Sequence, residues 1–252
     1  MYFEFAGVPG SGKSTLSSAL ESHFHSLQKN AISRDDALKK SFRSRNDGTI
    51  KNMFKRLPSR IWQPLIGVQS ALPEFATMSS RHLKFIAFIS KTLSQSDLPE
   101  LLIESIWKTT VRTFSEIELI NNHLENSEQI IMDEAFAQRC FTLFGYMENA
   151  VPDELINQYA QLAPISNHIF FIITDPATCA DRFMKRYQSH PVPYKFELNK
   201  EELTVNFKSG NRILGHLANE LEKQGKQVYR IDGNCDVNEC VETVCNTQMK
   251  SS

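Results

Sequence analysis

The sequence predicts an α/β protein in which short buried strands alternate with helices in a parallel sheet. An aromatic-rich strand at residues 2–6 leads through a glycine-rich loop at residues 7–14 into a segment with helical periodicity. Apolar runs with strand character recur at residues 128–134, 167–174 and 226–232, separated by segments of helical character. Strands that alternate with helices in this way are typical of parallel α/β sheets.

The composition is that of one large domain, which we expect to span residues 1–252. With 252 residues and 41% hydrophobic residues, the chain can bury a sizeable core. A net charge of −1 provides no field that would favour nucleic acid. No apolar stretch approaches a membrane span, and the first strand begins too early for a signal peptide. Five cysteines without zinc-like spacing are expected in a reducing compartment, so we expect a cytoplasmic protein with no transmembrane segment.

The first strand is followed by Gly-Val-Pro-Gly-Ser-Gly-Lys-Ser at residues 7–14, which matches the phosphate-binding loop pattern at every required position. Such a loop wraps closely around a polyphosphate, and backbone N–H groups and the positive end of the following helix point at it. We therefore predict nucleoside triphosphate binding, with Lys13 on the β- and γ-phosphates and the Ser14 hydroxyl on Mg²⁺. The candidate nucleotide-binding residues here are Gly7, Pro9, Gly10, Ser11, Gly12, Lys13, Ser14 and Thr15. The helix should run over residues 13–28.

The second strand is expected at residues 30–34 and ends at the carboxylate pair Asp35-Asp36. Functional groups gather at the carboxyl ends of strands in parallel α/β sheets, so one carboxylate could accept the proton of an incoming hydroxyl. The other reading is that one of them caps a helix starting near Ala37, because Asp is a favoured N-cap. We assign the chemical role to Asp35 and keep Asp36 as an acceptor-site candidate.

A basic stretch at residues 39–60 follows, in which eight Lys and Arg residues face the single acid Asp47. A solvated face is the commoner origin of such a run, and a basic wall for an anionic acceptor is the alternative. Arg43 is the acceptor candidate from this stretch. Helical segments at residues 81–93 and 99–124 complete an expected insertion over residues 39–124 between the second and third strands.

The third strand ends at Asp133 and is followed by Glu134. An apolar strand ending in Asp supplies what a Mg²⁺ site opposite a phosphate loop needs, because the Asp can hold the metal through its water shell. Glu134 is placed to orient water or the acceptor. Arg139 lies in the first turns of the next helix, which should face the same cleft, and it is a further acceptor candidate.

The fourth strand precedes a helix that opens at Asp175-Pro176 and carries Arg182 and Arg186 four residues apart, hence on one face. The proline-containing loop after it could close over bound nucleotide and exclude water, so a lid is expected at residues 182–199. The fifth strand then ends at a turn that contains Gly233, another nucleotide-binding candidate.

Together these features resemble the thymidylate kinase and nucleoside kinase group of P-loop kinases over nearly the whole chain. The resemblance implies a P-loop NTPase fold with a five-stranded parallel sheet in the order 2-3-1-4-5 and ATP as the phosphoryl donor. It also implies that Arg182 stacks on adenine while Arg186 meets phosphates. Ser33-Arg34-Asp35 falls where thymidylate kinases carry Arg-Glu. The chain departs from both families at Asp133-Glu134, where they carry Asp-Arg or Glu-Arg, and in its insertion.

The function that we predict is ATP- and Mg²⁺-dependent transfer of the γ-phosphate to the hydroxyl of a small-molecule acceptor. The acceptor remains open among nucleosides, sugars and acidic or glycan compounds, and a homodimer is left open too. The predicted catalytic residues are Lys13, Asp35, Glu134 and Arg186. A thymidylate-type nucleoside monophosphate kinase and a non-catalytic NTP-binding regulatory module are the alternatives. A Ras-like switch is disfavoured, because Asp-x-x-Gly and Asn-Lys-x-Asp motifs are missing.

Overall fold

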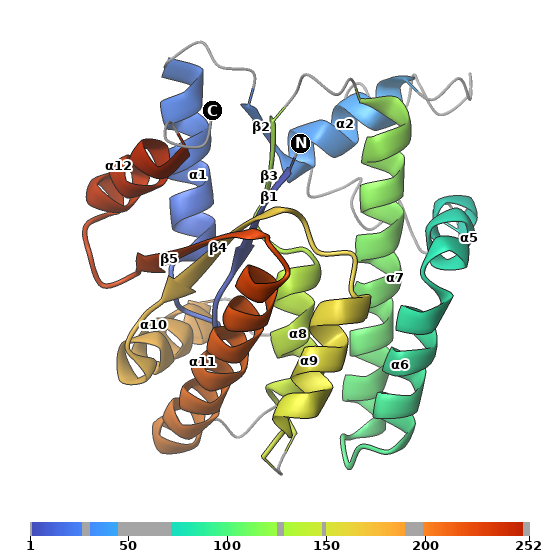
Figure 1. The fold of residues 1–252 in the computed structure, drawn as a ribbon. Coiled ribbons are helices and arrows are strands. Elements are labelled where there is room, and N and C mark those ends of the chain that lie inside the picture. The colour runs from blue at the N-terminus through green and yellow to red at the C-terminus, as the bar shows by residue number, and fades with distance from the viewer. Residues whose placement is uncertain are drawn as a thin grey trace. The chain divides into compact units, whose positions relative to one another are not determined.

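The structure is a computed structural model that describes residues 2–26, 31–44, 72–124, 129–147, 150–189 and 199–248. Its strands are β1 (Tyr2–Ala6), β2 (Ala31–Ser33), β3 (Gln129–Met132), β4 (His168–Ile173) and β5 (Gln227–Asp232). In the described residues they form one five-stranded sheet in the order β2-β3-β1-β4-β5 (Figure 1). The predicted fold class and strand order are therefore confirmed.

The register of the sheet is visible in β1, β4 and β5, which carry aromatic residues side by side. β1 pairs with β4 in parallel, with Phe5 opposite Phe170, and β4 pairs with β5 in parallel, with Phe170 opposite Tyr229. The Phe5 and Phe170 rings stack with their centroids 5.0 Å apart, and the Phe170 and Tyr229 rings lie 4.8 Å apart. These stacked neighbours hold the register, because a slip of one residue would move each ring to the other face.

The chain divides into two compact units, one formed by Asn30–Ile130 and the other by Tyr2–Lys29 with Ile131–Ser252. The helices of the first unit are α2 (Arg34–Ser44), α5 (Leu72–Arg81), α6 (Leu83–Ser94) and α7 (Glu100–His123). They confirm a helical insertion between β2 and β3. That residues 1–252 act as one domain stays a prediction.

Within the first unit, α7 is the helix on which the others pack. Phe114 of α7 is fully buried, and its ring meets those of Phe75 on α5 and Phe85 on α6, each with centroids 6.0 Å apart. Two ion pairs join the same helix to its neighbours: Arg34–Glu116 at 3.0 Å and Arg81–Glu118 at 3.1 Å. No described helix, in either unit, is long and apolar enough to cross a membrane.

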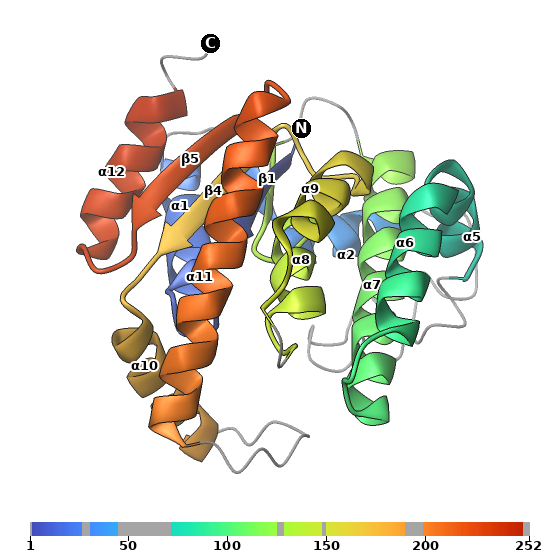
Figure 2. The ribbon, with the colours of Figure 1, turned by 60° about the horizontal axis from the view of Figure 1, so that its bottom comes forward.

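The second unit carries the phosphate loop and six helices in its described residues. They are α1 (Lys13–Ser26), α8 (Phe136–Phe144), α9 (Asp153–Leu162), α10 (Pro176–Ser189), α11 (Lys200–Lys223) and α12 (Val237–Gln248). α1 and α12 lie on one face of the sheet, and α8, α9 and α11 lie on the other (Figures 1 and 2). The loop between β1 and α1 follows the carboxyl end of β1.

α11 is the longest helix of this unit, and its ends follow from the sequence. The Asn199 side chain caps it by accepting from the N–H groups of Glu201 and Glu202, at 2.7 and 3.3 Å. Gly225, with φ of +80°, ends the helix in the left-handed conformation that favours glycine.

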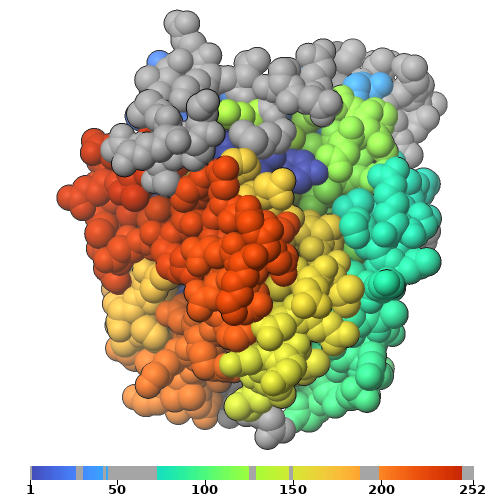
Figure 3. All heavy atoms as spheres, viewed as in Figure 1, coloured from blue at the N-terminus to red at the C-terminus, as the bar shows by residue number. Residues whose placement is uncertain are grey.

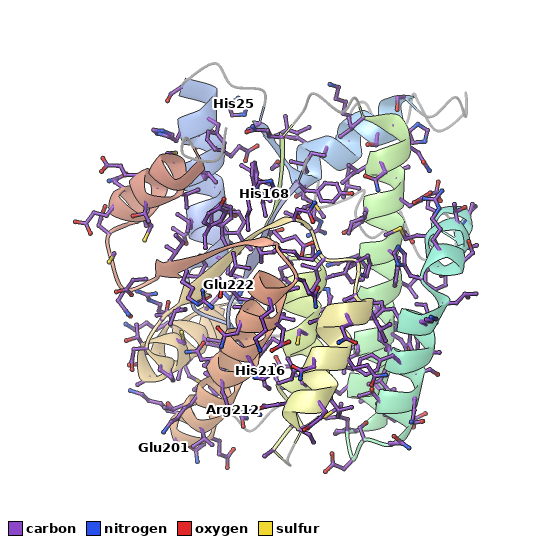
Figure 4. The ribbon with its side chains drawn as sticks, viewed as in Figure 1. His25, His168, Glu201, Arg212, His216 and Glu222 are labelled. Atoms are coloured by element: carbon purple, nitrogen blue, oxygen red, sulfur yellow. The ribbon has the colours of Figure 1, made fainter. Side chains whose placement is uncertain are left out.

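α11 runs beside α9 on the surface of the second unit (Figure 3). Arg212 of α11 donates to Asp153 of α9 at 2.8 Å, and His216 of α11 meets Asn157 of α9 at 2.7 Å. Arg212 and His216 lie one turn apart and point to the same side of α11 (Figure 4). These contacts hold the helical layer that covers the sheet face opposite α1.

The start of α2 corrects one expectation. The strand ends at Ser33 and the helix begins at Arg34, so Asp35 and Asp36 both lie inside its first turn. The Ser33 hydroxyl accepts from the Asp36 N–H at 3.4 Å, and the Asp36 carboxylate instead pairs with Lys39 at 2.6 Å. The reading that one of these carboxylates caps a helix starting near Ala37 is therefore wrong, because the helix starts at Arg34 and Ser33 occupies the capping position.

A buried carboxylate, Glu4 of β1, joins three parts of the second unit. The N-cap residue of α8, Ala135, has no side-chain acceptor, and Glu4 takes that role by accepting from the Ala137 N–H at 2.8 Å. Its other oxygen accepts from the Ser166 N–H at 2.7 Å. Burial raises the pKa of Glu4, and these two hydrogen bonds oppose that rise.

We expect Glu4→Ala to lower the free energy of unfolding by about 2–6 kcal/mol, since each buried N–H left without an acceptor costs about 1–3 kcal/mol. Glu4→Gln keeps the volume and one acceptor, so its loss should be smaller. Glu242→Ala, on the exposed side of α12, is the control and should change stability by less than about 0.5 kcal/mol. Equal loss in Glu4→Ala and Glu242→Ala, measured by denaturant unfolding, would contradict this role of Glu4.

Candidate active site

The glycines of the phosphate loop meet two different constraints. Gly10 and Gly12 have φ of +82° and +99°, in the left-handed region where side chains are strained. A Cβ on Gly10 would also collide with the carbonyl of Cys179 on α10, whereas a Cβ on Gly12 would meet nothing within 4 Å. The backbone at Gly10 is thus packed against α10, and Gly12 faces open space where a ligand can approach.

This difference predicts unequal effects of two matched substitutions. Gly12→Ala should cost about 1–2 kcal/mol of stability, from the left-handed conformation alone. Gly10→Ala should cost about 1–3 kcal/mol more, because the added methyl also overpacks against Cys179. Thermal unfolding of both variants checks the order, and a Gly12→Ala variant that is the less stable of the two would show that the loop is packed differently.

Side chains from α8, from α10 and from the residue after β4 hold the loop in place. The Gly7 N–H donates to Gln138 Oε1 of α8 at 3.0 Å, and the Thr174 hydroxyl donates to the Ser11 carbonyl at 2.9 Å. Arg182 Nη1 of α10 lies 3.5 Å from the Gly10 carbonyl and 3.3 Å from the Gly233 carbonyl. The loop is therefore shaped before any ligand binds, which lowers the cost of ordering it around a phosphate.

The loop ends in the N-terminus of α1, which forms an anion cradle. The Leu16 N–H donates to the Gly12 carbonyl at 2.9 Å, so the helical hydrogen bonds begin there. The N–H groups of Lys13, Ser14 and Thr15 precede that first bond and have no acceptor within the helix. Together with the positive end of the helix they favour a bound phosphate.

Lys13 lies at the floor of this cradle and is only 7% exposed. Its Nζ donates to the carbonyls of Gly7 at 2.7 Å and Val8 at 3.3 Å. Burial lowers the pKa of Lys13 to about 8, Glu134 and Asp133 oppose this shift, and Arg186 adds to it. The ammonium is therefore desolvated and lies near two carboxylates and a second cation, an arrangement that a polyphosphate would complete.

A pocket of about 390 Å³ opens over the loop. It is lined by Pro9, Gly10, Ser11, Gly12, Lys13, Ser14, Thr15, Leu16, Glu134, Gln138, Ile172, Arg182, Phe183, Arg186, Gly233, Cys235, Val237 and Cys240. The structure thus brings nearly all predicted nucleotide-binding residues to one cavity. Gly7 lies beneath the loop, where it bonds to Gln138. Residues 190–198 of the expected lid lie outside the described residues.

The carboxylates after β3 occupy different places. Glu134 lines the pocket, while Asp133 is half-buried and near enough to Lys13 to affect its pKa. Arg139 is buried, and its Nη2 lies 3.3 Å from Glu134 Oε2. Arg139 therefore holds Glu134 in position and is not itself part of the pocket wall.

The candidates on α2 lie in the other compact unit. Asp35 is half-buried in the first turn of α2, and Asp36 is exposed beside Lys39. The side chain of Arg43 and residues 45–60 of the basic stretch lie outside the described residues. The assignments of Asp35, Asp36 and Arg43 to an acceptor site stay predictions.

Sequence reasoning missed one wall of the pocket. Phe183 of α10, Cys235, and Val237 and Cys240 of α12 line it, and none was a candidate. Phe183 lies between Arg182 and Arg186 in the sequence, and Val237 and Cys240 are three residues apart on one helix face. A helical projection could therefore have suggested all three residues. The apolar character of this wall suits the flat face of a nucleobase.

The residues present suit a divalent cation next to phosphate. Ser14 lines the pocket, and the carboxylates of Asp133 and Glu134 lie near Lys13, so the donor set is all oxygen, as Mg²⁺ prefers. No group of three or more His, Cys, Asp or Glu side chains suited to a metal occurs among the described residues. A cation here would therefore depend on phosphate oxygens for part of its coordination, which is usual for Mg²⁺.

No protein-family model matches the chain, and no curated protein sequence does. Solved structures match it over nearly full length. The chain is similar to deoxyadenosine kinase from M. mycoides with bound dCTP, at 16% identity over 99% of this chain and 100% of that one, with a TM-score of 0.47. It is also similar to thymidylate kinase from Ehrlichia chaffeensis, at 13% identity over 98% of both chains, with a TM-score of 0.48. Both proteins come from the group that the sequence resembles.

Proposed function

We propose that this chain is an ATP-dependent phosphotransferase that moves the γ-phosphate to a hydroxyl of a small-molecule acceptor. The observation that carries the proposal is the preshaped glycine loop with the desolvated Lys13 at its floor, inside a pocket that Arg182 and Arg186 also line. A cavity with this charge and shape suits a nucleoside triphosphate: phosphates at the loop and the base at the apolar wall.

The chemistry that we assign to these residues is positional and electrostatic. Phosphoryl transfer needs little covalent help from the protein, so alignment and neutralisation of charge supply most of the rate. Lys13 and Arg186 neutralise phosphate oxygens, and Arg182 packs beside the base. Ser14 and Asp133 hold Mg²⁺, which when bound supplies further positive charge at the phosphates.

Two carboxylates are assigned to the acceptor. Asp35 accepts the proton of the attacking hydroxyl, and Glu134, which Arg139 holds in position, orients the acceptor at the pocket. Nucleosides, sugars and acidic compounds are the acceptor classes of this proposal. A nucleoside monophosphate, which would receive the phosphoryl group on a phosphate oxygen, is the second candidate.

The test is an ATP-consumption screen of the purified chain against nucleosides, nucleoside monophosphates, sugars and sugar acids. ATP consumption that depends on one acceptor class and that is lost in Lys13→Ala would support the phosphotransferase. Nucleotide binding without turnover across the whole panel would favour a non-catalytic binding module. Failure to bind ATP or any other nucleoside triphosphate would contradict the proposal altogether.

A further inference from the structure

Gln138 of α8 is buried at the junction of the phosphate loop and the pocket, and one end of its amide has a clear partner. Its Oε1 accepts from the Gly7 N–H at 3.0 Å, and the residue is only 4% exposed. A backbone N–H can only donate, so the side-chain atom that faces it must be the oxygen. The Gly7 N–H therefore identifies which end of the amide is the oxygen and which is the nitrogen.

The other end of the amide has no such partner. The two N–H groups of Gln138 Nε2 find no acceptor among the residues that the structure describes, although Gln138 forms part of the pocket wall. Nε2 is also not among the buried polar atoms without a partner, so it retains contact with the open space of the pocket. Two hydrogen-bond donors on a rigidly held side chain thus remain available to a ligand.

The position of Gln138 indicates which part of a ligand they would meet. β3 lies on one side of β1, and β4 and β5 lie on the other. The apolar wall comes from α10 and α12, which follow β4 and β5, whereas Glu134 and Gln138 follow β3. With the base at the apolar wall and the chain of phosphates crossing the loop, the last phosphate is the one nearest Gln138.

We infer that Gln138 Nε2 donates a hydrogen bond to the γ-phosphate of the bound triphosphate. This inference rests on the proposed function and adds a residue that recognises the transferred group. The backbone N–H groups of the loop bind di- and triphosphates alike, whereas Gln138 responds to the presence of the third phosphate. A neutral amide also suits this place, because it adds donors beside Glu134 without introducing a further charge to be desolvated.

The test uses Gln138→Glu, which keeps an oxygen for the Gly7 N–H and replaces the donating NH₂ by a carboxylate oxygen. We expect the affinity for a non-hydrolysable ATP analogue to fall by about 10- to 100-fold, as expected for loss of a hydrogen bond to a charged group. The new carboxylate also repels the phosphates of ADP, so ADP affinity should fall too. The fall should be at least about threefold smaller than that for the ATP analogue, since ADP lacks the contacted phosphate. Gln161→Glu, the same chemical change on the exposed side of α9, is the control and should alter neither affinity.

Equal losses for both nucleotides in Gln138→Glu, or no loss for either, would overturn the inference and leave Gln138 as a support of the loop. If this variant does not fold, Gln138→Met serves instead. Gln138→Met removes the acceptor of the Gly7 N–H and so lowers the affinity for both nucleotides. The ratio of ATP-analogue to ADP affinity then reports the loss of the Nε2 donor alone, and an unchanged ratio overturns the inference. If the wild-type chain binds neither nucleotide, the proposed function is overturned and this inference with it. If the wild-type chain binds both nucleotides and the variant has the same ratio of ATP-analogue to ADP affinity, only the inference is overturned.

Discussion

Lys13→Ala is expected to reduce phosphoryl transfer by more than about 10³-fold, because the variant loses the charge that neutralises the transferred group in a desolvated site. The fold should survive. Lys13 Nζ is held by two loop carbonyls, and burial already disfavours its charged form. Steady-state rates and thermal unfolding of the variant check both parts. Lys208→Ala on the exposed side of α11 is the matched control, and it should change neither.

The lowered pKa of Lys13 adds a pH signature to the same variant. Between about pH 8 and 10.5 the unfolded lysine is protonated more fully than the buried one, so the unfolded state binds more protons. The contribution of Lys13 to the stability of the nucleotide-free chain should therefore rise with pH across this window. Lys13→Ala should lack this rise relative to wild type. Parallel stability curves for wild type and Lys13→Ala, measured by denaturant unfolding, would show that Lys13 is not desolvated.

Asp35→Asn is expected to reduce turnover by about 10²–10⁴-fold, the usual contribution of a general base, with little change in ATP affinity. Asp35 follows β2 and lies in the first turn of α2, where it is half-buried. An amide keeps the size of the side chain but cannot take the acceptor proton. Rates with a saturating acceptor and separately measured ATP binding distinguish a lost base from lost nucleotide affinity.

Asp36→Asn is the neighbouring control. It removes only an exposed ion pair with Lys39, because Ser33 and not Asp36 caps α2. Such a change should shift stability by less than about 0.5 kcal/mol and lower turnover far less than Asp35→Asn does. A large loss of turnover in Asp36→Asn with normal rates in Asp35→Asn would mean that the two roles are reversed.

The elements that the sequence predicted well are those with strong local patterns. Gly-Val-Pro-Gly-Ser-Gly-Lys-Ser identifies the turn between β1 and α1 because glycine, lysine and serine are each needed at a particular place. The apolar run around Phe170 and Phe171 reads as a buried strand, since both side chains pack into the sheet core. The strand order came from the resemblance to a kinase group, because the run of elements in sequence does not by itself say which strands are neighbours.

Errors arose where short-range signals compete. Ser33, Asp35 and Asp36 are all good N-cap residues within four positions, so the sequence allowed more than one start for α2. The structure places Ser33 at the cap, and that leaves both carboxylates inside the helix. The acceptor role of Arg139, which was expected because its helix should face the cleft, stays a prediction. In the structure Arg139 is buried, and its Nη2 lies 3.3 Å from Glu134 Oε2.

The sequence by itself therefore determined the class of the fold, the phosphate loop and the residue types that can bind a triphosphate. Only the tertiary structure decided that Lys13 is desolvated and that Gly10 packs on Cys179. The same holds for Gln138, which joins Gly7 across 131 residues of chain. Local patterns report which backbone conformation a segment prefers. Burial, pKa and the free end of an amide depend instead on what the rest of the chain brings into contact, and no periodicity within one segment encodes that.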